Sequence, residues 1–178
     1  MLHRKNNLCR RRSASIYQQK ETTMSQDAVL KDLQGKIGAQ MHVSPWVDMT
    51  QEKINAFADA TEDHQWIHID AERAKKDSPY GSTIAHGYFT LSLYPGLRDM
   101  VNEEKPVFPG VKQVINYGID KLRFPNAVKV GSRVRARCEL VSIEEVKGGL
   151  QMVERFTAEI DGEDRPACVA DVVMRMYF

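Results

Sequence analysis

Asp63 and His68 are the residues of this chain whose types and spacing could do chemistry. They lie in the stretch DATEDHQWIHID (residues 59–70), which holds four carboxylates and two histidines around the apolar pair Trp66-Ile67. On one helix, residues five positions apart point about 140° away from each other, so these two side chains can meet only across a loop. Such a loop could bring both to one water molecule, while Trp66 and Ile67 pack against apolar surface and exclude bulk solvent. General acid–base groups acquire shifted pKa values in that setting.

Two other interpretations of the stretch remain open. In the first, the loop is only solvated: Asp70 caps the following helix, and Asp59 and Glu62 are surface residues. In the second, His64, His68 and an aspartate bind a metal ion, since histidines four positions apart can ligate zinc when they lie on a helix. The stretch is predicted to be a loop and offers no third ligand at a recognisable spacing, so we expect no metal.

The composition is that of an ordinary globular domain. The chain has 178 residues, of which 42% are hydrophobic and 28% charged, and a formal net charge of +1. Residues 1–23 carry six basic side chains and one acid, which leaves 19 basic and 23 acidic residues in residues 24–178. The body of the chain is therefore mildly acidic, and we expect no nucleic-acid partner.

We expect residues 1–23 to be a disordered or misassigned basic extension, followed by a single domain over residues 24–178. The segment lacks the apolar run of a secretory signal, although its Arg-rich, acid-poor composition also overlaps with that of mitochondrial transit peptides. The sequence contains no run of about 18 apolar residues, so we expect no membrane span. Cys9, Cys138 and Cys168 form no CxxC pair, which argues against a disulfide framework or a zinc ribbon. These features indicate a cytoplasmic protein with Cys138 and Cys168 in its core.

From about residue 111 the sequence predicts strands. After the Val-, Ile- and Tyr-rich segment 111–124, three segments alternate apolar and polar residues: 132–140, 150–160 and 166–178. Turns are predicted at Gly148-Gly149 and Asp161-Gly162, because glycine accepts the positive φ angles of tight hairpins. This pattern predicts an antiparallel meander with one buried face.

The first half predicts helices. Thr50 can cap a helix that carries Ile54, Phe57 and Ala58 at helical spacing and ends near residue 61. Asp70 can cap a second, short helix over AERAKK (residues 71–76).

A third segment, TIAHGYFTLSLYPGL (residues 83–97), is uncharged and apolar on nearly every side. A helix of this kind must be buried, so we predict an α+β fold in which the sheet wraps around one long central helix.

Residues 57–93 resemble the signature of MaoC-like dehydratases, which include the (R)-specific enoyl-CoA hydratases of the hot-dog fold. The matching positions are Asp63, His68, Asp70, Ala74 and the segment Ile84-Ala85-His86-Gly87. The QWIH variant (residues 65–68) and the later segment NYGIDKLRFPNAVKVGSRVRA (residues 116–136) resemble the nodulation-protein-N-like branch. The similarity runs from about residue 40 to the C-terminus.

The resemblance implies a hydratase or dehydratase of trans-2-enoyl thioesters, in which Asp63 and His68 hold and activate a water molecule. The sequence does not decide which of the two takes the water proton. The resemblance also implies that Gly87 is the oxyanion donor, and the first-turn N–H groups of a buried helix are suited to that role because they lack intrahelical partners. We expect no cofactor apart from the coenzyme A or carrier-protein thioester itself.

Five further residues are candidates for substrate binding. His86 either contacts the substrate or only braces the first helical turn, and Tyr88 could line an acyl tunnel. Asn116, Lys121 and Arg123 lie on or beside the strand that follows the central helix. Lys121 and Arg123 of one subunit of a homodimer could contact the phosphates of a coenzyme A bound to the other subunit. Alternatively, they could be solvated charges at a strand edge.

Two alternative functions use the same fold. A hot-dog thioesterase would bind the same thioester but hydrolyse it and release a free thiol. A non-catalytic acyl-thioester-binding subunit would bind without turnover, and the presence of both Asp63 and His68 argues against that role.

Overall fold

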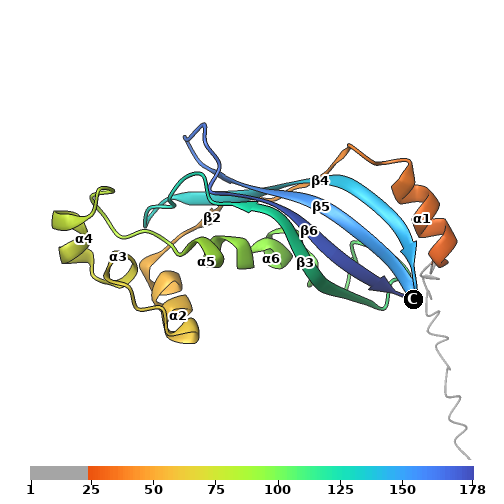
Figure 1. Cartoon of the computed structure of the whole chain (residues 1–178), viewed down its shortest axis with the longest axis horizontal. Coiled ribbons are helices and arrows are strands. Elements are labelled where there is room, and N and C mark those ends of the chain that lie inside the picture. The colour runs from red at the N-terminus through yellow and green to blue at the C-terminus, as the bar shows by residue number, and fades with distance from the viewer. Residues whose placement is uncertain (1–23) are drawn as a thin grey trace, which may run out of the picture.

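The computed structural model describes residues 24–178. The predicted basic extension over residues 1–23 lies outside the described residues. The described part of the chain is one antiparallel sheet with helices at its two ends and beneath its concave face (Figure 1).

Six strands form the sheet, in the order β1-β4-β5-β6-β3, with β2 also pairing with β4. Their bounds are β1 Gln40–Val43, β2 Val47–Asp48, β3 Gln113–Arg123, β4 Arg133–Val146, β5 Gly149–Ile160 and β6 Cys168–Tyr177. All the pairings are antiparallel. The predicted meander is β4-β5-β6, and β3 extends it as an edge strand.

Strand alternation places one face of the sheet in the core, as predicted. The fully buried members include Val134, Ala136, Cys138, Leu140, Met152, Phe156, Ala158, Cys168, Ala170, Met174 and Met176. Gly148 and Gly162 adopt φ angles of 89° and 78° in the two connecting turns. Residues with a Cβ would be strained there. The core positions predicted for Cys138 and Cys168 are confirmed, and both thiols are free.

The helices are α1 (Gln26–Gln34), α2 (Gln51–Thr61), α3 (Trp66–Ile69), α4 (Ala71–Asp77), α5 (Gly87–Ser92) and α6 (Tyr94–Leu97). The predicted caps are confirmed: the Thr50 hydroxyl accepts from the N–H of Lys53 at 3.4 Å, and the Asp70 carboxylate accepts from the N–H of Arg73 at 2.9 Å. Figure 1 shows α2, α3 and α4 grouped at one end of the sheet, α1 at the other end, and α5 and α6 beneath the sheet.

The prediction of one continuous helix over residues 83–97 was wrong at its start. Residues 83–86 are held in an extended conformation by pairing with residues 128–130: Ile84 forms a bridge with Lys129, and the N–H of Ala85 donates to the Val128 oxygen at 2.8 Å. The helix therefore begins only at Gly87.

The same helix was also predicted to be unbroken and fully buried, and neither is the case. It is interrupted at Leu93, since Pro95 has no N–H to continue the hydrogen-bond ladder. Tyr88 is 67% exposed, so one side of α5 is open in the isolated chain.

A buried polar triad fixes α6 against the sheet. Arg98, just after α6, donates from Nε to the carboxylate of Glu154 on β5 at 3.0 Å, and the Tyr94 hydroxyl donates to the same carboxylate at 2.6 Å. The three residues are at most 4% exposed. Over residues 24–178, every helix is too short or too polar to cross a membrane.

Candidate active site

A sharp reversal of the chain brings Asp63 and His68 together. Helix α2 ends at Thr61, and Glu62 adopts a left-handed conformation with φ of 60°. The segment EDHQWIH (residues 62–68) was predicted to be all loop, but Trp66–Ile69 form a single helical turn, in which the N–H of Asp70 donates to the Trp66 oxygen at 3.0 Å. One turn is too short to leave a periodic signal in the sequence.

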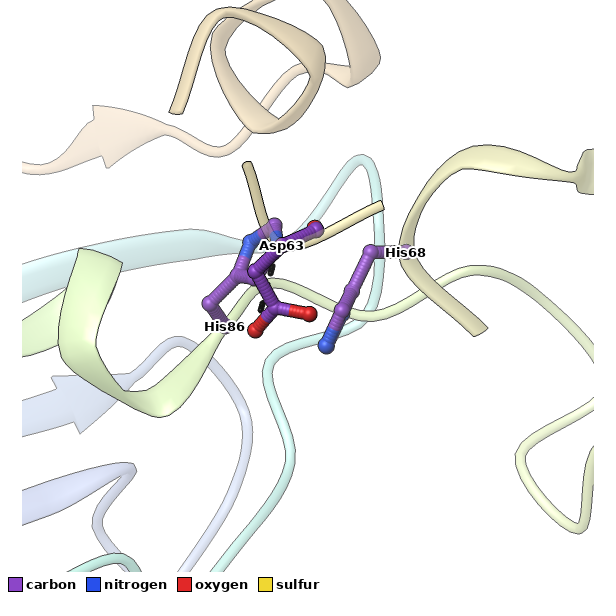
Figure 2. A group of neighbouring side chains, drawn as sticks. All are labelled: Asp63, His68 and His86. Carbon is purple, nitrogen blue, oxygen red and sulfur yellow. Dashed lines mark hydrogen bonds and ion pairs between the residues drawn. The ribbon is translucent and has the colours of Figure 1, made fainter. Parts of the chain in front are cut away.

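Three side chains converge at this reversal: Asp63, His68 and His86 (Figure 2). One nitrogen or oxygen atom from each lies within 4.8 Å of the others. Figure 2 shows the Asp63 carboxylate and a ring nitrogen of His68 on the same side of the cluster, with His86 beside them. His64 is not in the cluster, because its Nε2 pairs with the carboxylate of Asp59 at 2.9 Å.

His68 is buried and has a defined tautomer. Its Nδ1 lies 2.7 Å from the main-chain oxygen of Ile84. That oxygen can only accept, so Nδ1 carries the proton and Nε2 holds a lone pair. Burial lowers the pKa of His68 below its usual value, and the neighbouring His86 lowers it further. These effects outweigh the Ile84 hydrogen bond and the Asp63 carboxylate, which raise the pKa. A neutral imidazole with a free Nε2 is a general base in its working form.

His86 contacts both other members of the cluster. It is 3% exposed, and its Nε2 donates to the main-chain oxygen of Asp63 at 2.9 Å and lies 4.0 Å from the Asp63 carboxylate. Its ring stacks on His68 with centroids 3.7 Å apart and planes 27° apart, and it also packs on Phe57. Sequence reasoning had given His86 as a substrate contact or a brace of the first helical turn, and it missed these contacts because they join segments far apart along the chain.

The Asp63 carboxylate is the open side of the cluster, since its side chain is 53% exposed. Trp66 and Ile67 are half-buried beside it, and the guanidinium of Arg73 lies over the Trp66 ring at 4.4 Å. The carboxylate is therefore accessible from solvent, while the imidazoles are enclosed by protein.

Gly87 follows His86 and opens α5. A Cβ at Gly87 would lie 3.0 Å from ring carbons of Phe124, so the ring would have to shift by a few tenths of an ångström to admit one. Phe124 also contacts Tyr88 edge-on, with ring centroids 5.8 Å apart. Sequence reasoning missed Phe124, because its place over Gly87 depends on how β3 ends and not on any local pattern.

The cluster fits proton transfer better than metal binding. Zinc ligands at about 2.1 Å from a tetrahedral ion lie about 3.4 Å from each other. Here the His86 Nε2 is 4.0 Å from the nearest Asp63 carboxylate oxygen and already donates to a carbonyl oxygen. The lone pairs of two stacked imidazoles also lie in two separate planes that are only 27° apart, which is unfavourable for convergence on one ion.

The remaining predicted residues lie along β3 and α5. Tyr88 and Asn116 line a cavity of about 280 Å³ between these elements, together with Leu91, Ser92, Tyr94, Pro95, Ile119 and Val172. The Lys121 ammonium pairs with the carboxylate of Asp171 at 3.0 Å. Arg123 is exposed at the end of β3 and donates to the main-chain oxygen of Leu122. The structure therefore brings Asp63, His68 and His86 together, and places Lys121 in a separate ion-pair group, where it shares the Asp171 carboxylate with Arg155.

Comparison with known proteins assigns the chain to one family. Residues 32–161 match the family described as MaoC like domain. The chain is 49% identical over 145 residues to 3-hydroxyacyl-thioester dehydratase Z of Mycobacterium tuberculosis, with 81% of this chain and 93% of the relative covered. The chain belongs to the MaoC-like dehydratase family.

Two further comparisons agree with this assignment. The chain is 39% identical over 157 residues to nodulation protein N of Rhizobium leguminosarum, covering 84% of this chain and 91% of the relative. A solved structure of a monoamine oxidase regulatory protein from Archaeoglobus fulgidus superposes with a TM-score of 0.69 at 22% identity, covering 88% of this chain and 96% of that one. The predicted resemblance to MaoC-like dehydratases and the hot-dog fold are thus confirmed.

Proposed function

We propose that the protein adds water reversibly to trans-2-enoyl thioesters, and so interconverts them with (R)-3-hydroxyacyl thioesters. The observation that carries this proposal is the convergence of the Asp63 carboxylate and the free nitrogen of neutral His68 beside the first turn of α5. The 49% identity to a protein named as a 3-hydroxyacyl-thioester dehydratase supports the same chemistry.

One water molecule fits between the two groups. Their nearest polar atoms lie within 4.8 Å of one another. A water that makes a hydrogen bond of about 2.8 Å to each group can bridge such a separation. The Asp63 carboxylate can accept one hydrogen of this water and orient it, while His68 Nε2 accepts the other. The half-exposed carboxylate and the buried imidazole then have different tasks: Asp63 orients the water and stabilises the imidazolium, and His68 carries the proton.

The water molecule and His68 together account for every proton that moves in the reaction. In hydration, the water oxygen bonds to C3 of the enoyl group as His68 Nε2 takes a water proton, and the electrons of the double bond move to the thioester as an enolate. His68 then returns the proton to C2, which leaves a hydroxyl on C3. Dehydration is the reverse. No electron is gained or lost overall, so we expect the reaction to proceed without a cofactor.

The enolate oxygen requires a donor, and we assign this role to the N–H of Gly87. It belongs to the first turn of α5, where N–H groups have no intrahelical partner. A donor fixed before the reaction stabilises the developing charge most effectively.

The substrate is an acyl thioester of coenzyme A or of a carrier protein. The cavity of about 280 Å³ beside Tyr88 is lined mostly by apolar side chains and lies one helical turn from Gly87, which suits an acyl chain. The exposed Arg123 at the end of β3 is available to a phosphate group. Lys121 is a weaker candidate, since it already pairs with Asp171.

We further propose a homodimer that forms along β3. This edge strand exposes Val114, Ile115, Tyr117 and Ile119, each by at least 36%. An edge strand with unpaired N–H and C=O groups and apolar side chains invites pairing with another chain. A second copy would also cover Tyr88, next to the cavity.

The test is an absorbance assay with crotonyl-CoA, run in parallel with a thiol reagent. Loss of the enoyl-thioester absorbance without release of thiol is the expected result. Release of free thiol would instead identify a thioesterase on the same fold. Binding of acyl-CoA, seen as a rise in melting temperature, without turnover of crotonyl, longer or carrier-bound enoyl thioesters would identify a non-catalytic subunit.

A further inference from the structure

The imidazole of His86 serves neither as a helix cap nor as an isolated core residue. His86 occupies the N-cap position of α5, but its side chain makes no capping hydrogen bond to the helix. A histidine that only braced the first turn would direct a ring nitrogen to one of the free N–H groups there. Instead its Nε2 is directed at the loop that carries Asp63.

The two contacts of His86 use different parts of its ring. The edge donates a hydrogen bond from Nε2 to the main-chain oxygen of Asp63, and the face stacks on His68 at 3.7 Å. Because the acceptor is a carbonyl oxygen, Nε2 carries the proton and Nδ1 holds a lone pair. This Nδ1 is buried and has no hydrogen-bond partner among residues 24–178. Among residues 24–178, the hydrogen bond and ring contacts that orient the imidazole are therefore those to Asp63, His68 and Phe57.

We propose that His86 is a positioning residue that couples Asp63 to His68, so that the carboxylate and the imidazole keep one relative geometry during turnover. This inference deepens the proposed function and rests on it. The Asp63 side chain is 53% exposed, so surrounding protein encloses it on only part of its surface. An error of about 1 Å in the placement of reacting groups costs on the order of 10²-fold in rate. One rigid ring that is bonded to the main-chain oxygen of Asp63 and stacked on the imidazole of His68 reduces that error without touching the substrate.

Two substitutions separate the contacts. His86→Gln keeps an N–H donor that can reach the Asp63 oxygen but removes the ring face. His86→Phe keeps a ring that can stack on His68 and Phe57 but removes the donor. If coupling requires both contacts, each variant loses about 10²-fold in kcat, with KM nearly unchanged. His64→Gln is the matched control, because His64 lies in the same loop, is exposed and pairs only with Asp59; it should keep wild-type kcat.

The pH profile gives a readout that a merely structural role would not change. The titratable or charged groups that face His68 are Asp63 and His86, and His86 acts to lower the pKa of His68. Both His86 variants should therefore shift the acid limb of kcat/KM to higher pH. An NMR titration of the His68 ring should show the same shift without any substrate, so the coupling can be tested even if crotonyl-CoA is not turned over.

Three results would overturn the proposed role of His86. Wild-type kcat in either His86 variant would overturn the proposal, because one contact alone would then be sufficient. A loss confined to KM would overturn it as well, since His86 would then be a substrate contact. An unchanged His68 titration in both variants would show that the rings are not coupled.

Discussion

His68 donates its Nδ1 proton to the main-chain oxygen of Ile84 at 2.7 Å, and this bond connects the proposed base to the extended segment that precedes α5. Ile84 itself forms a bridge with Lys129, and its N–H donates to the Ile67 oxygen at 3.0 Å. The extended segment that delays the start of α5 therefore also sets the tautomer of His68. The part of the central helix that was predicted incorrectly is the part that orients the site.

Removal of either reacting group should abolish most of the turnover. We expect Asp63→Asn and His68→Gln each to lower kcat by about 10²–10⁴-fold, the usual contribution of general acid–base catalysis. Asp63 is half-exposed, so its variant should unfold at the wild-type temperature, which circular dichroism can check. Asp59→Asn is the matched control: its carboxylate lies in the same loop but pairs with His64. Near-normal turnover in the Asp63 or His68 variant would contradict the assignment of the site.

Acid should inactivate the enzyme through His68. Its folded-state pKa is lowered, first by burial and then by His86, so the neutral form persists below the usual value of 6.5. We expect kcat/KM to be constant above that pH and to fall only as the pH passes through the lowered value. The fold loses stability as the pH falls from the usual histidine value to the lowered one, because unfolded His68 binds a proton in this range and folded His68 does not. An acid limb above the usual histidine pKa would be inconsistent with a neutral, buried base.

Much of the fold was predictable because its signals are local. The alternation in β4, β5 and β6 assigns each side chain to one face, and Thr50 and Asp70 cap helices through hydrogen bonds that reach only three residues. The convergence of Asp63 with His68 followed from the argument that five-residue spacing requires a break in the helix. Each of these inferences depends on residues that are neighbours in the sequence.

The features that were not predicted depend on distant contacts. His86 acquires its place from a ring stack across 18 positions and from a bond to Asp63 across 23 positions. Phe124 covers Gly87 from the end of β3. The late start of α5 results from the pairing of residues 83–86 with residues 128–130. No periodicity in a short window of sequence carries such information.

A side chain at Gly87 should lower activity. Gly87→Ala places a methyl group 3.0 Å from the ring of Phe124 and beside the N–H that we assign to the thioester oxygen. We expect kcat/KM to fall toward the roughly 10²-fold loss that follows removal of an oxyanion donor. Gly96→Ala is the control, because a Cβ there meets no heavy atom within 4 Å among the described residues. Wild-type kinetics in Gly87→Ala would show that the substrate does not approach this N–H.

Removing one charge from the buried triad of Tyr94, Arg98 and Glu154 should destabilise the fold strongly, whereas removing both charges together should destabilise it little. Burial, together with the Glu154 carboxylate, raises the pKa of the Tyr94 hydroxyl, which therefore stays a hydrogen-bond donor. Arg98→Met leaves the fully buried Glu154 without its counter-ion, and we expect the free energy of unfolding to fall by about 3–5 kcal/mol. The double variant Arg98→Met/Glu154→Gln removes both charges but keeps an acceptor for Tyr94, and should recover most of that loss. Urea denaturation measures both, and equal losses in the two variants would show that the charge pair is not the cause.

Dimerisation along β3 should be sensitive to charge on that strand. Ile115 is 40% exposed on β3, and Ile115→Lys would place an ammonium group in the proposed interface, where desolvation of an unpaired charge is unfavourable. We expect this variant to be monomeric when the wild type is dimeric, as measured by light scattering coupled to gel filtration. Ile37→Lys is the matched control, since Ile37 is 51% exposed near β1, at the opposite edge of the sheet. If Ile115→Lys remains a dimer and Ile37→Lys does not, the chains pair through the β1 edge, and the apolar surface of β3 beside Tyr88 must have another role.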